Sequence, residues 1–113
     1  MSTITDNELS NLYADYARPM YVYDEKVILR QAKTLIETFP DFEFLYSIKT
    51  NPFFPVVRSI AGAGAGVGVD AASEREVGIA HEMEVPKNRV LFSTPGKTRE
   101  NIERSIDTSI GFF

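Results

Sequence analysis

Hydrophobic side chains recur at the spacing of an α-helix in several stretches of the chain. The first stretch, residues 6–16, predicts a short amphipathic helix, because its apolar residues stand at positions i, i+3, i+4 and i+7. These residues are Leu9, Leu12, Tyr13 and Tyr16. A second helix is predicted from Asp24, a good N-cap, to about Phe39. The same spacing predicts further helices over residues 52–61, 73–83 and 98–106.

Short runs rich in β-branched and aromatic residues separate these helices and predict strands. The runs cover residues 20–23, 44–48, 67–71 and 89–92, and a further strand is expected to begin at Thr108. From residue 44 onward strands alternate with helices, which is typical of right-handed βαβ units around a parallel sheet. The sequence therefore predicts an α/β fold. Periodicity alone leaves both an open doubly wound sheet and a closed barrel possible.

The composition narrows the class of protein. The chain has 113 residues, no Cys and a single His, which excludes a disulfide scaffold, a thiolate zinc site, a cysteine nucleophile and a multi-histidine metal site. That histidine, His81, falls within a predicted helix and is expected to be structural. A net charge of −4 argues against nucleic acid or an anionic membrane as the main partner. Because no signal peptide or membrane-spanning run is visible, a cytoplasmic location is expected.

Two charged residues stand where predicted strands end. Lys49 follows the strand over 44–48, and Asp70 lies at the end of the strand over 67–71. In α/β folds ligands bind at the carboxyl ends of the strands. Strand alternation would put Ser47 and Lys49 on one face. A lysine amine there can form a Schiff base with a carbonyl, and a neighbouring carboxylate would position it. The alternative is an exposed lysine that ends a strand and an aspartate in an ordinary turn.

Three further motifs have structural explanations. Ser73 and Glu76 form a Ser-x-x-Glu capping box at the start of a predicted helix. The alternating glycines of residues 62–68 precede a strand, so they predict a flexible turn and not a dinucleotide fingerprint. Residues 94–98 follow a strand and precede a helix, as a P-loop does, but Leu91 stands where the P-loop pattern requires glycine. Nucleotide hydrolysis is therefore not expected.

Four motifs occur in a fixed order along the chain. They are Pro-Met-Tyr-Val-Tyr-Asp at 19–24, Tyr-Ser-Ile-Lys-Thr-Asn at 46–51, Val-Asp-Ala-Ala-Ser at 69–73 followed by Glu76, and residues 91–98. In this order the motifs resemble the alanine-racemase-like (fold type III) pyridoxal-phosphate (PLP) enzymes, and among them the ornithine/diaminopimelate decarboxylase branch. The resemblance covers about residues 18–107, which is most of the chain.

The resemblance implies a fold, a cofactor and a reaction. The fold would be a TIM-type (β/α)₈ barrel followed by a β-domain, in a homodimer with active sites between subunits. Residues 1–17 would form an N-terminal helical segment, and residues 18–113 the first half of the barrel. Lys49 would carry PLP as a Schiff base, with Asp70 beside the imine and Glu76 supporting the site. The implied reaction is decarboxylation of a basic or diamino acid of the ornithine, lysine or diaminopimelate type.

Some features depart from the family pattern, and other functions stay open. The turn over residues 62–68 is longer than is usual for the family, and the family's remaining cofactor and substrate residues come later than residue 113. The sequence is thus expected to be a truncated part of a longer protein, inactive by itself and prone to self-association. The alternatives are a PLP-dependent racemase of the same fold, a non-catalytic PLP-binding barrel, and a degenerate chain that serves only subunit association. The motifs at 19–24 and 70–73 favour the decarboxylase.

Overall fold

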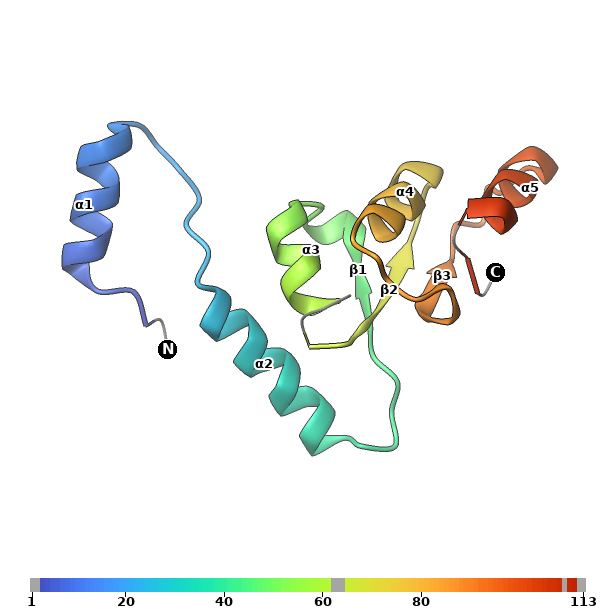
Figure 1. Cartoon of the computed structure of the whole chain (residues 1–113), viewed down its shortest axis with the longest axis horizontal. Helices are drawn as coiled ribbons and strands as arrows, with labels where there is room; N and C mark the ends of the chain where they lie inside the picture. Colours follow the sequence, from blue (N-terminus) through green and yellow to red (C-terminus); the bar gives the residue numbers. More distant parts are fainter. Residues whose placement is uncertain (1–2, 62–64, 109, 112–113) are drawn as a thin grey trace.

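Three parallel strands, each followed by a helix, form the centre of the molecule (Figure 1). The structure is a computed structural model that describes residues 3–61, 65–108 and 110–111. The α-helices are α1 (Asp6–Tyr16), α2 (Glu25–Thr38), α3 (Phe54–Ile60), α4 (Glu74–Glu82) and α5 (Arg99–Thr108). The strands are β1 (Leu45–Ser47), β2 (Gly68–Ala71) and β3 (Val90–Phe92), and two 3-10 turns are η1 (Ile48–Thr50) and η2 (Lys87–Arg89).

The sheet has the order β1-β2-β3, with both strand pairs parallel. Ser47 is the register partner of Asp70, which in turn is the partner of Leu91. Because parallel strands point the same way, their carboxyl ends all lie at one edge of the sheet, and α3, α4 and α5 carry the chain back to the other edge. The α/β fold with a parallel sheet predicted from the sequence is confirmed.

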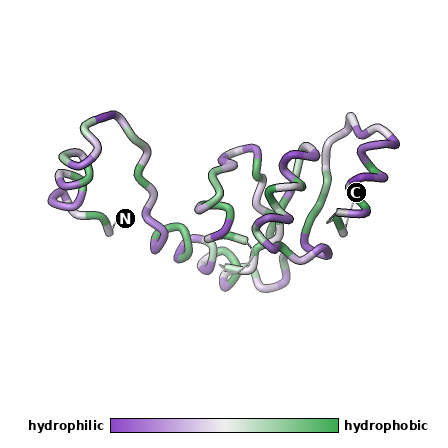
Figure 2. Tube along the Cα trace, turned by 45° about the horizontal axis from the view of Figure 1, so that its top comes forward, coloured by the Kyte–Doolittle hydropathy of each residue, from purple (hydrophilic) through white to green (hydrophobic). Residues whose placement is uncertain are grey.

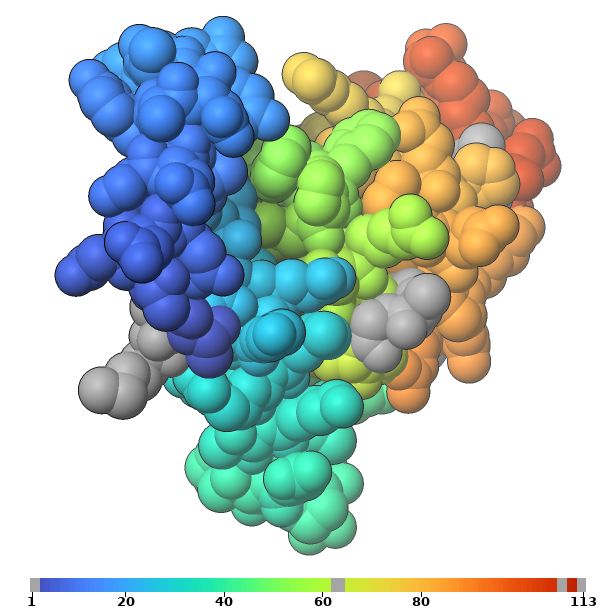
Figure 3. Space-filling model, turned by 60° about the vertical axis from the view of Figure 1, so that its left-hand side comes forward, coloured from blue at the N-terminus to red at the C-terminus, as the bar shows by residue number. Residues whose placement is uncertain are grey.

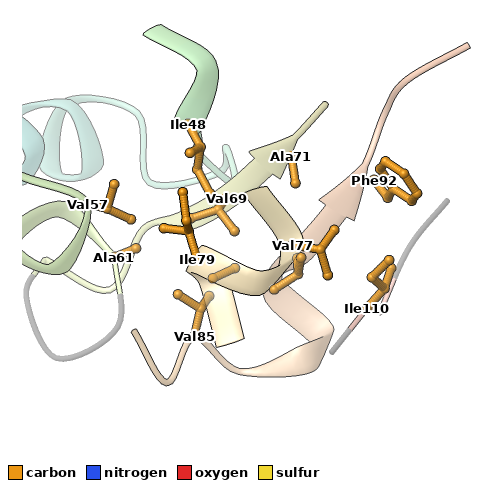
Figure 4. Close-up of a cluster of buried hydrophobic side chains, with 12 residues drawn as sticks. Ile48, Val57, Ala61, Val69, Ala71, Val77, Ile79, Val85, Phe92 and Ile110 are labelled. Carbon is orange, nitrogen blue, oxygen red and sulfur yellow. The ribbon is translucent and has the colours of Figure 1, made fainter. Parts of the chain in front are cut away.

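One face of the sheet packs against helices to form the hydrophobic core (Figure 4). Alternate residues of a strand point to opposite faces. On β2 and β3 the buried side chains of this face are Val69, Ala71, Val90 and Phe92. They pack with apolar residues of the helices and turns, namely Ile48, Val57, Ala61, Val77, Ile79, Ala80, Val85 and Ile110. The opposite face carries Ser47, Asp70 and Leu91, and it is therefore the face on which polar chemistry can occur.

The N-terminal part of the chain lies beside this core and contributes little to it. Thr5 and Glu8 form a capping box at the start of α1, but α1 buries none of its residues. Asp24 caps α2, as predicted, by accepting hydrogen bonds from the N–H groups of Lys26 and Val27. Figure 3 shows the first residues (blue) along one side of the molecule. The radius of gyration is 16.4 Å, against about 13 Å for a compact domain of this size.

The predicted helices all occur, with ends that shift by a few residues. Figure 2 shows hydrophobic and hydrophilic residues mixed along the helical parts of the trace. Within the described ranges, no helix combines the length and the apolar character that a membrane span needs.

Three strand predictions need correction. Residues 20–23 have strand-forming side chains but no pairing partner, so they form an irregular segment. The strand expected over 44–48 ends at Ser47, where the chain enters η1. Thr108 belongs to α5 and does not begin a strand; Gly111, although not in a strand, donates its N–H to Val90 O over 3.2 Å. Residues 109, 112 and 113, and residues 62–64 of the glycine turn, lie outside the described residues.

Candidate active site

Lys49 lies at the carboxyl end of β1, in the 3-10 turn η1. The preceding residue, Ile48, is fully buried in the core, and the turn then brings Lys49 to the surface. Thr50 Oγ1 donates to Ser47 O over 2.7 Å, and the Asn51 N–H donates to Ile48 O over 3.1 Å. The predicted place of Lys49 at the strand end is correct. Because the strand stops at Ser47, however, strand alternation no longer fixes the direction of the lysine side chain.

Asp70 has an oxygen that lacks a hydrogen-bond donor. Its Oδ1 atom is buried, and among the described residues it has no hydrogen-bond partner. Buried polar atoms of native proteins are almost always hydrogen-bonded, since an unpaired one costs free energy. Asp70 is also the register partner of Ser47, the last residue before the Lys49 turn. The carboxylate is therefore an acceptor beside the lysine turn that a bound molecule with an N–H or O–H group would satisfy.

Glu76 is held against the segment that leaves β2. Its Oε2 atom accepts a hydrogen bond of 2.7 Å from the Ala72 N–H. Ser73 Oγ accepts one of 3.3 Å from the Glu76 N–H, which confirms Ser73 as the cap of α4. In a capping box the glutamate would reach the N–H of Ser73 itself; here it reaches one residue further back. Glu76 thereby orders the residues directly after Asp70.

The elements that carry the three predicted site residues meet at one edge of the sheet. The turn η1, which carries Lys49, contacts β2, which carries Asp70. Helix α4, which carries Glu76, also contacts β2. An amine and two carboxylates thus flank the carboxyl ends of β1 and β2. Such a group can hold a carbonyl compound through the amine and balance positive charge on a bound molecule.

Lys97 is a fourth charged residue at this edge, in the loop over residues 94–98 that was considered as a P-loop and set aside. Its Nζ atom donates a hydrogen bond of 2.7 Å to Phe92 O at the carboxyl end of β3. The same atom lies 5.4 Å from the centre of the Phe92 ring. The loop over residues 94–98 therefore folds back onto the strand that precedes it. A lysine five residues after a strand was the only signal for this contact.

Asn51 and Tyr23 form another contact that sequence reasoning missed. Asn51 Nδ2 donates to the Tyr23 hydroxyl over 3.1 Å, which links the Lys49 turn to the N-terminal segment. The two residues are 28 positions apart, so local pattern does not predict their meeting. Tyr23 belongs to the motif at 19–24 and Asn51 to the motif at 46–51. The presence of both residues in family motifs was the signal in the sequence that could have suggested this contact.

The resolved pKa shifts lie in the N-terminal segment. The hydroxyl and N–H of Thr3 donate to Asp24 and hold its pKa below the ordinary value; the N–H groups of Lys26 and Val27 add to the effect. The Thr5 N–H and hydroxyl lower the pKa of Glu8 in the same way. Both pKa values are therefore lowered by hydrogen bonds within the N-terminal segment, from Thr3 to Asp24 and from Thr5 to Glu8.

This chain consists of parallel βα units, and its charged residues lie at the carboxyl ends of the strands. Such an arrangement is typical of the class of α/β proteins that bind their ligands at this edge of the sheet. A sequence profile described as "Pyridoxal-dependent decarboxylase, pyridoxal binding domain" matches residues 25–113. The chain belongs to this family. The family description agrees with the PLP cofactor expected from the sequence.

Relatives and solved structures agree with this assignment. The diaminopimelate decarboxylase of Aquifex aeolicus (strain VF5) is 29% identical over 105 residues, covering 93% of this chain and 24% of that protein. The lysine/ornithine decarboxylase of Vibrio vulnificus, complexed with putrescine, has a TM-score of 0.83 at 23% identity and covers 97% of this chain and 31% of that one. SrLDC in complex with PLP and cadaverine has a TM-score of 0.79 at 21% identity, with coverage of 95% and 28%.

These comparisons confirm the fold expected from the resemblance. The neighbours are PLP decarboxylases of the TIM-barrel type, and the βα units of this chain superpose on the corresponding part of that fold. The chain spans about a quarter of the length of the curated relatives it matches.

Proposed function

We propose that this chain provides the cofactor lysine of a PLP-dependent decarboxylase that acts on a basic or diamino acid. Lys49 is the residue that holds the cofactor. The observation that carries the proposal is the unpaired, buried Oδ1 of Asp70 beside the turn of the lysine, within a chain that belongs to a pyridoxal-binding family.

The residues at this edge fit PLP. Lys49 is exposed and makes no hydrogen bond or ion pair with the residues that the structure describes, so its amine is available to a carbonyl group. Asp70 offers an unsatisfied acceptor and a negative charge. When bound, PLP supplies a ring that takes up the electrons released as CO₂ leaves.

Each residue of the chain would then have a separate task. The Lys49 amine holds the cofactor through its carbonyl carbon. The Asp70 carboxylate accepts a hydrogen bond from the bound molecule and stabilises positive charge on it. Glu76 keeps its hydrogen bond to the Ala72 N–H and so fixes the chain that leads away from Asp70.

The class of substrate is proposed from the relatives. The matching curated proteins include diaminopimelate decarboxylases, and the structural neighbours include complexes with putrescine and with cadaverine. Putrescine and cadaverine are amines with a second basic group. Diaminopimelate, for which the curated proteins are named, is an acid that also carries a second amine. We therefore propose lysine, ornithine or diaminopimelate as the substrate type.

The proposal includes the organisation expected from the resemblance. Residues 1–17 form an N-terminal helical segment and residues 18–113 a portion of the barrel domain of a cytoplasmic homodimer. Sedimentation of the protein encoded by the complete reading frame tests the dimer, with a single monomeric species as the contrary result.

The decarboxylase activity is tested on the protein that is used for sedimentation. CO₂ release from lysine, ornithine and diaminopimelate should require PLP, and Lys49→Ala should abolish it while Lys33→Ala, on the exposed surface of α2, leaves it intact. Full activity of the Lys49→Ala variant would overturn the proposal. Interconversion of amino-acid enantiomers without CO₂ release would identify a racemase instead.

A further inference from the structure

Besides the hydrogen bond from its N–H to Ile48 O, Asn51 takes part in three further hydrogen bonds directly after the Lys49 turn. Its Nδ2 atom donates to the Tyr23 hydroxyl, and its Oδ1 atom accepts from the Phe53 N–H, each over 3.1 Å. Its backbone oxygen accepts a 3.1 Å hydrogen bond from the Tyr46 hydroxyl. The rings of Tyr23 and Phe53 are also in contact, with centroids 5.5 Å apart. Tyr23, Asn51 and Phe53 thus form a closed triangle of contacts.

We propose that Tyr23 is a positioning residue for Lys49, acting through Asn51. This inference rests on the proposed function of Lys49 as the cofactor lysine. The Tyr23 hydroxyl holds the Asn51 amide, and the amide fixes the end of the turn that presents the lysine.

The hydrogen bonds to Tyr23 and Phe53 allow the Asn51 side-chain amide only one orientation. The Phe53 N–H is a donor, so the amide must turn its oxygen toward Phe53 and its NH₂ group toward Tyr23. The Tyr23 hydroxyl therefore acts as the acceptor. Reversing the amide would place two donors against each other at Phe53, and this cost locks the side chain in its observed orientation.

The Lys49 turn is fixed at both of its ends. Before the lysine, Ile48 is buried in the core and cannot move without opening it. After the lysine, Asn51 is attached to Tyr23, Tyr46 and Phe53. The lysine side chain is long, and it makes no hydrogen bond or ion pair with described residues. The backbone of the turn therefore determines which positions its amine can reach.

Tyr23 is itself well anchored. The next residue, Asp24, caps α2 by accepting hydrogen bonds from two N–H groups of its first turn. The start of α2 thus fixes the backbone at Tyr23, and the ring contact with Phe53 orients its side chain. The N-terminal segment is in this way a structural part of the lysine site.

The test compares Tyr23→Phe with Tyr21→Phe. The first change removes only the hydroxyl and keeps the ring contact. The second makes the same chemical change two residues away, at a side chain that is 91% exposed. The measured quantities are the hydrogen-exchange rates of the Asn51 and Phe53 amides without PLP, the dissociation constant of PLP bound at Lys49, and the melting temperature.

Tyr23→Phe should raise both exchange rates and the PLP dissociation constant about two- to ten-fold, the range for losing one hydrogen bond. Tyr21→Phe should change neither quantity and should keep the melting temperature. Tyr23→Phe should lower the melting temperature by only a few degrees, as expected for the loss of one exposed hydrogen bond. In an Asn51→Ala background, Tyr23→Phe should have less than about a two-fold further effect on the dissociation constant, because its effect passes through Asn51.

Each contrary outcome has its own meaning. If exchange rates and PLP binding are unchanged in Tyr23→Phe while borohydride reduction and peptide mapping still place the pyridoxyl group on Lys49, the positioning role is wrong and the proposed function stands. If PLP reacts with another lysine in every variant, the proposed function fails, and with it the inference. Equal effects of Tyr23→Phe with and without Asn51 would show that Tyr23 does not act through this amide.

Discussion

Ser47 and Asp70 are register partners across β1 and β2, so the aspartate stands beside the last strand residue before the Lys49 turn. The two residues are 23 positions apart in the chain, and the parallel pairing of their strands brings them together. The site is thus a product of strand register. A shift of one residue in this pairing would turn Asp70 toward the helix-covered face.

Reaction with PLP followed by borohydride reduction should place the pyridoxyl label on Lys49. The Lys97 amine is engaged with Phe92 O over 2.7 Å, and Lys33 lies on α2, away from the strand ends. Peptide mapping of the reduced protein measures the distribution of label. A Lys33→Arg control should keep the pattern, whereas label concentrated on Lys97 would contradict the assignment.

Asp70→Asn should weaken PLP binding much more than folding. The buried Oδ1 atom has no partner among the described residues, so the change removes no hydrogen bond to that atom within them. We expect the free energy of unfolding to change by less than about 1 kcal/mol. The dissociation constant of PLP should rise about ten-fold or more, as for the loss of a charge-assisted hydrogen bond.

Asp41→Asn, in the exposed loop between α2 and β1, is the matched control for this change. It should alter neither quantity. Unchanged PLP binding in Asp70→Asn would make Asp70 an ordinary turn residue, and a large loss of stability would make it a structural one.

Local patterns predicted much of the fold. The α1 stripe and the Asp24 cap depend on residues close in sequence, and both were predicted correctly. The strand predicted over 20–23 was wrong because a strand needs a partner, and strand propensity does not say whether one is present.

The candidate site was only partly predictable. Alternation of strands and helices is enough to place Lys49 and Asp70 at one edge of the sheet. The unpaired Asp70 oxygen depends on which atoms surround it, and the Tyr23–Asn51 hydrogen bond joins residues 28 positions apart. Such features arise from tertiary packing, which periodicity does not report.

Val69→Ala should destabilise the fold by about 2 kcal/mol. Val69 is fully buried in the core, on the middle strand of the sheet. Truncation to alanine therefore removes buried methyl groups and leaves a cavity between the sheet and its helices. Val22→Ala, at a 39% exposed side chain of the N-terminal segment, is the control and should cost less than about 0.5 kcal/mol. Urea unfolding measures both, and equal losses would contradict this description of the core.

The contact between Thr3 and Asp24 should weaken in acid. The pKa of Asp24 is below the ordinary value of 3.8 because Thr3 and the first turn of α2 donate to the carboxylate. The ionised form is thus favoured in the folded state. The resulting stabilisation is complete above pH 3.8 and is lost as the pH falls through the lower, folded-state pKa.

An NMR titration of the Asp24 carboxyl carbon tests this prediction. Its midpoint should lie below 3.8, and Thr3→Ala, which removes the hydroxyl donor, should raise it. A midpoint at or above 3.8 in the unaltered protein would contradict the hydrogen bonding described at the start of α2.

Since α1 buries none of its residues, the first part of the chain is free to diverge. A segment that adds nothing to the core can change in length or sequence while the free energy of unfolding of the protein stays nearly the same. The family profile begins at residue 25, which is also the first residue of α2. Among homologues we therefore expect insertions, deletions and substitutions to accumulate before residue 19, where the motif that ends with Tyr23 and Asp24 begins.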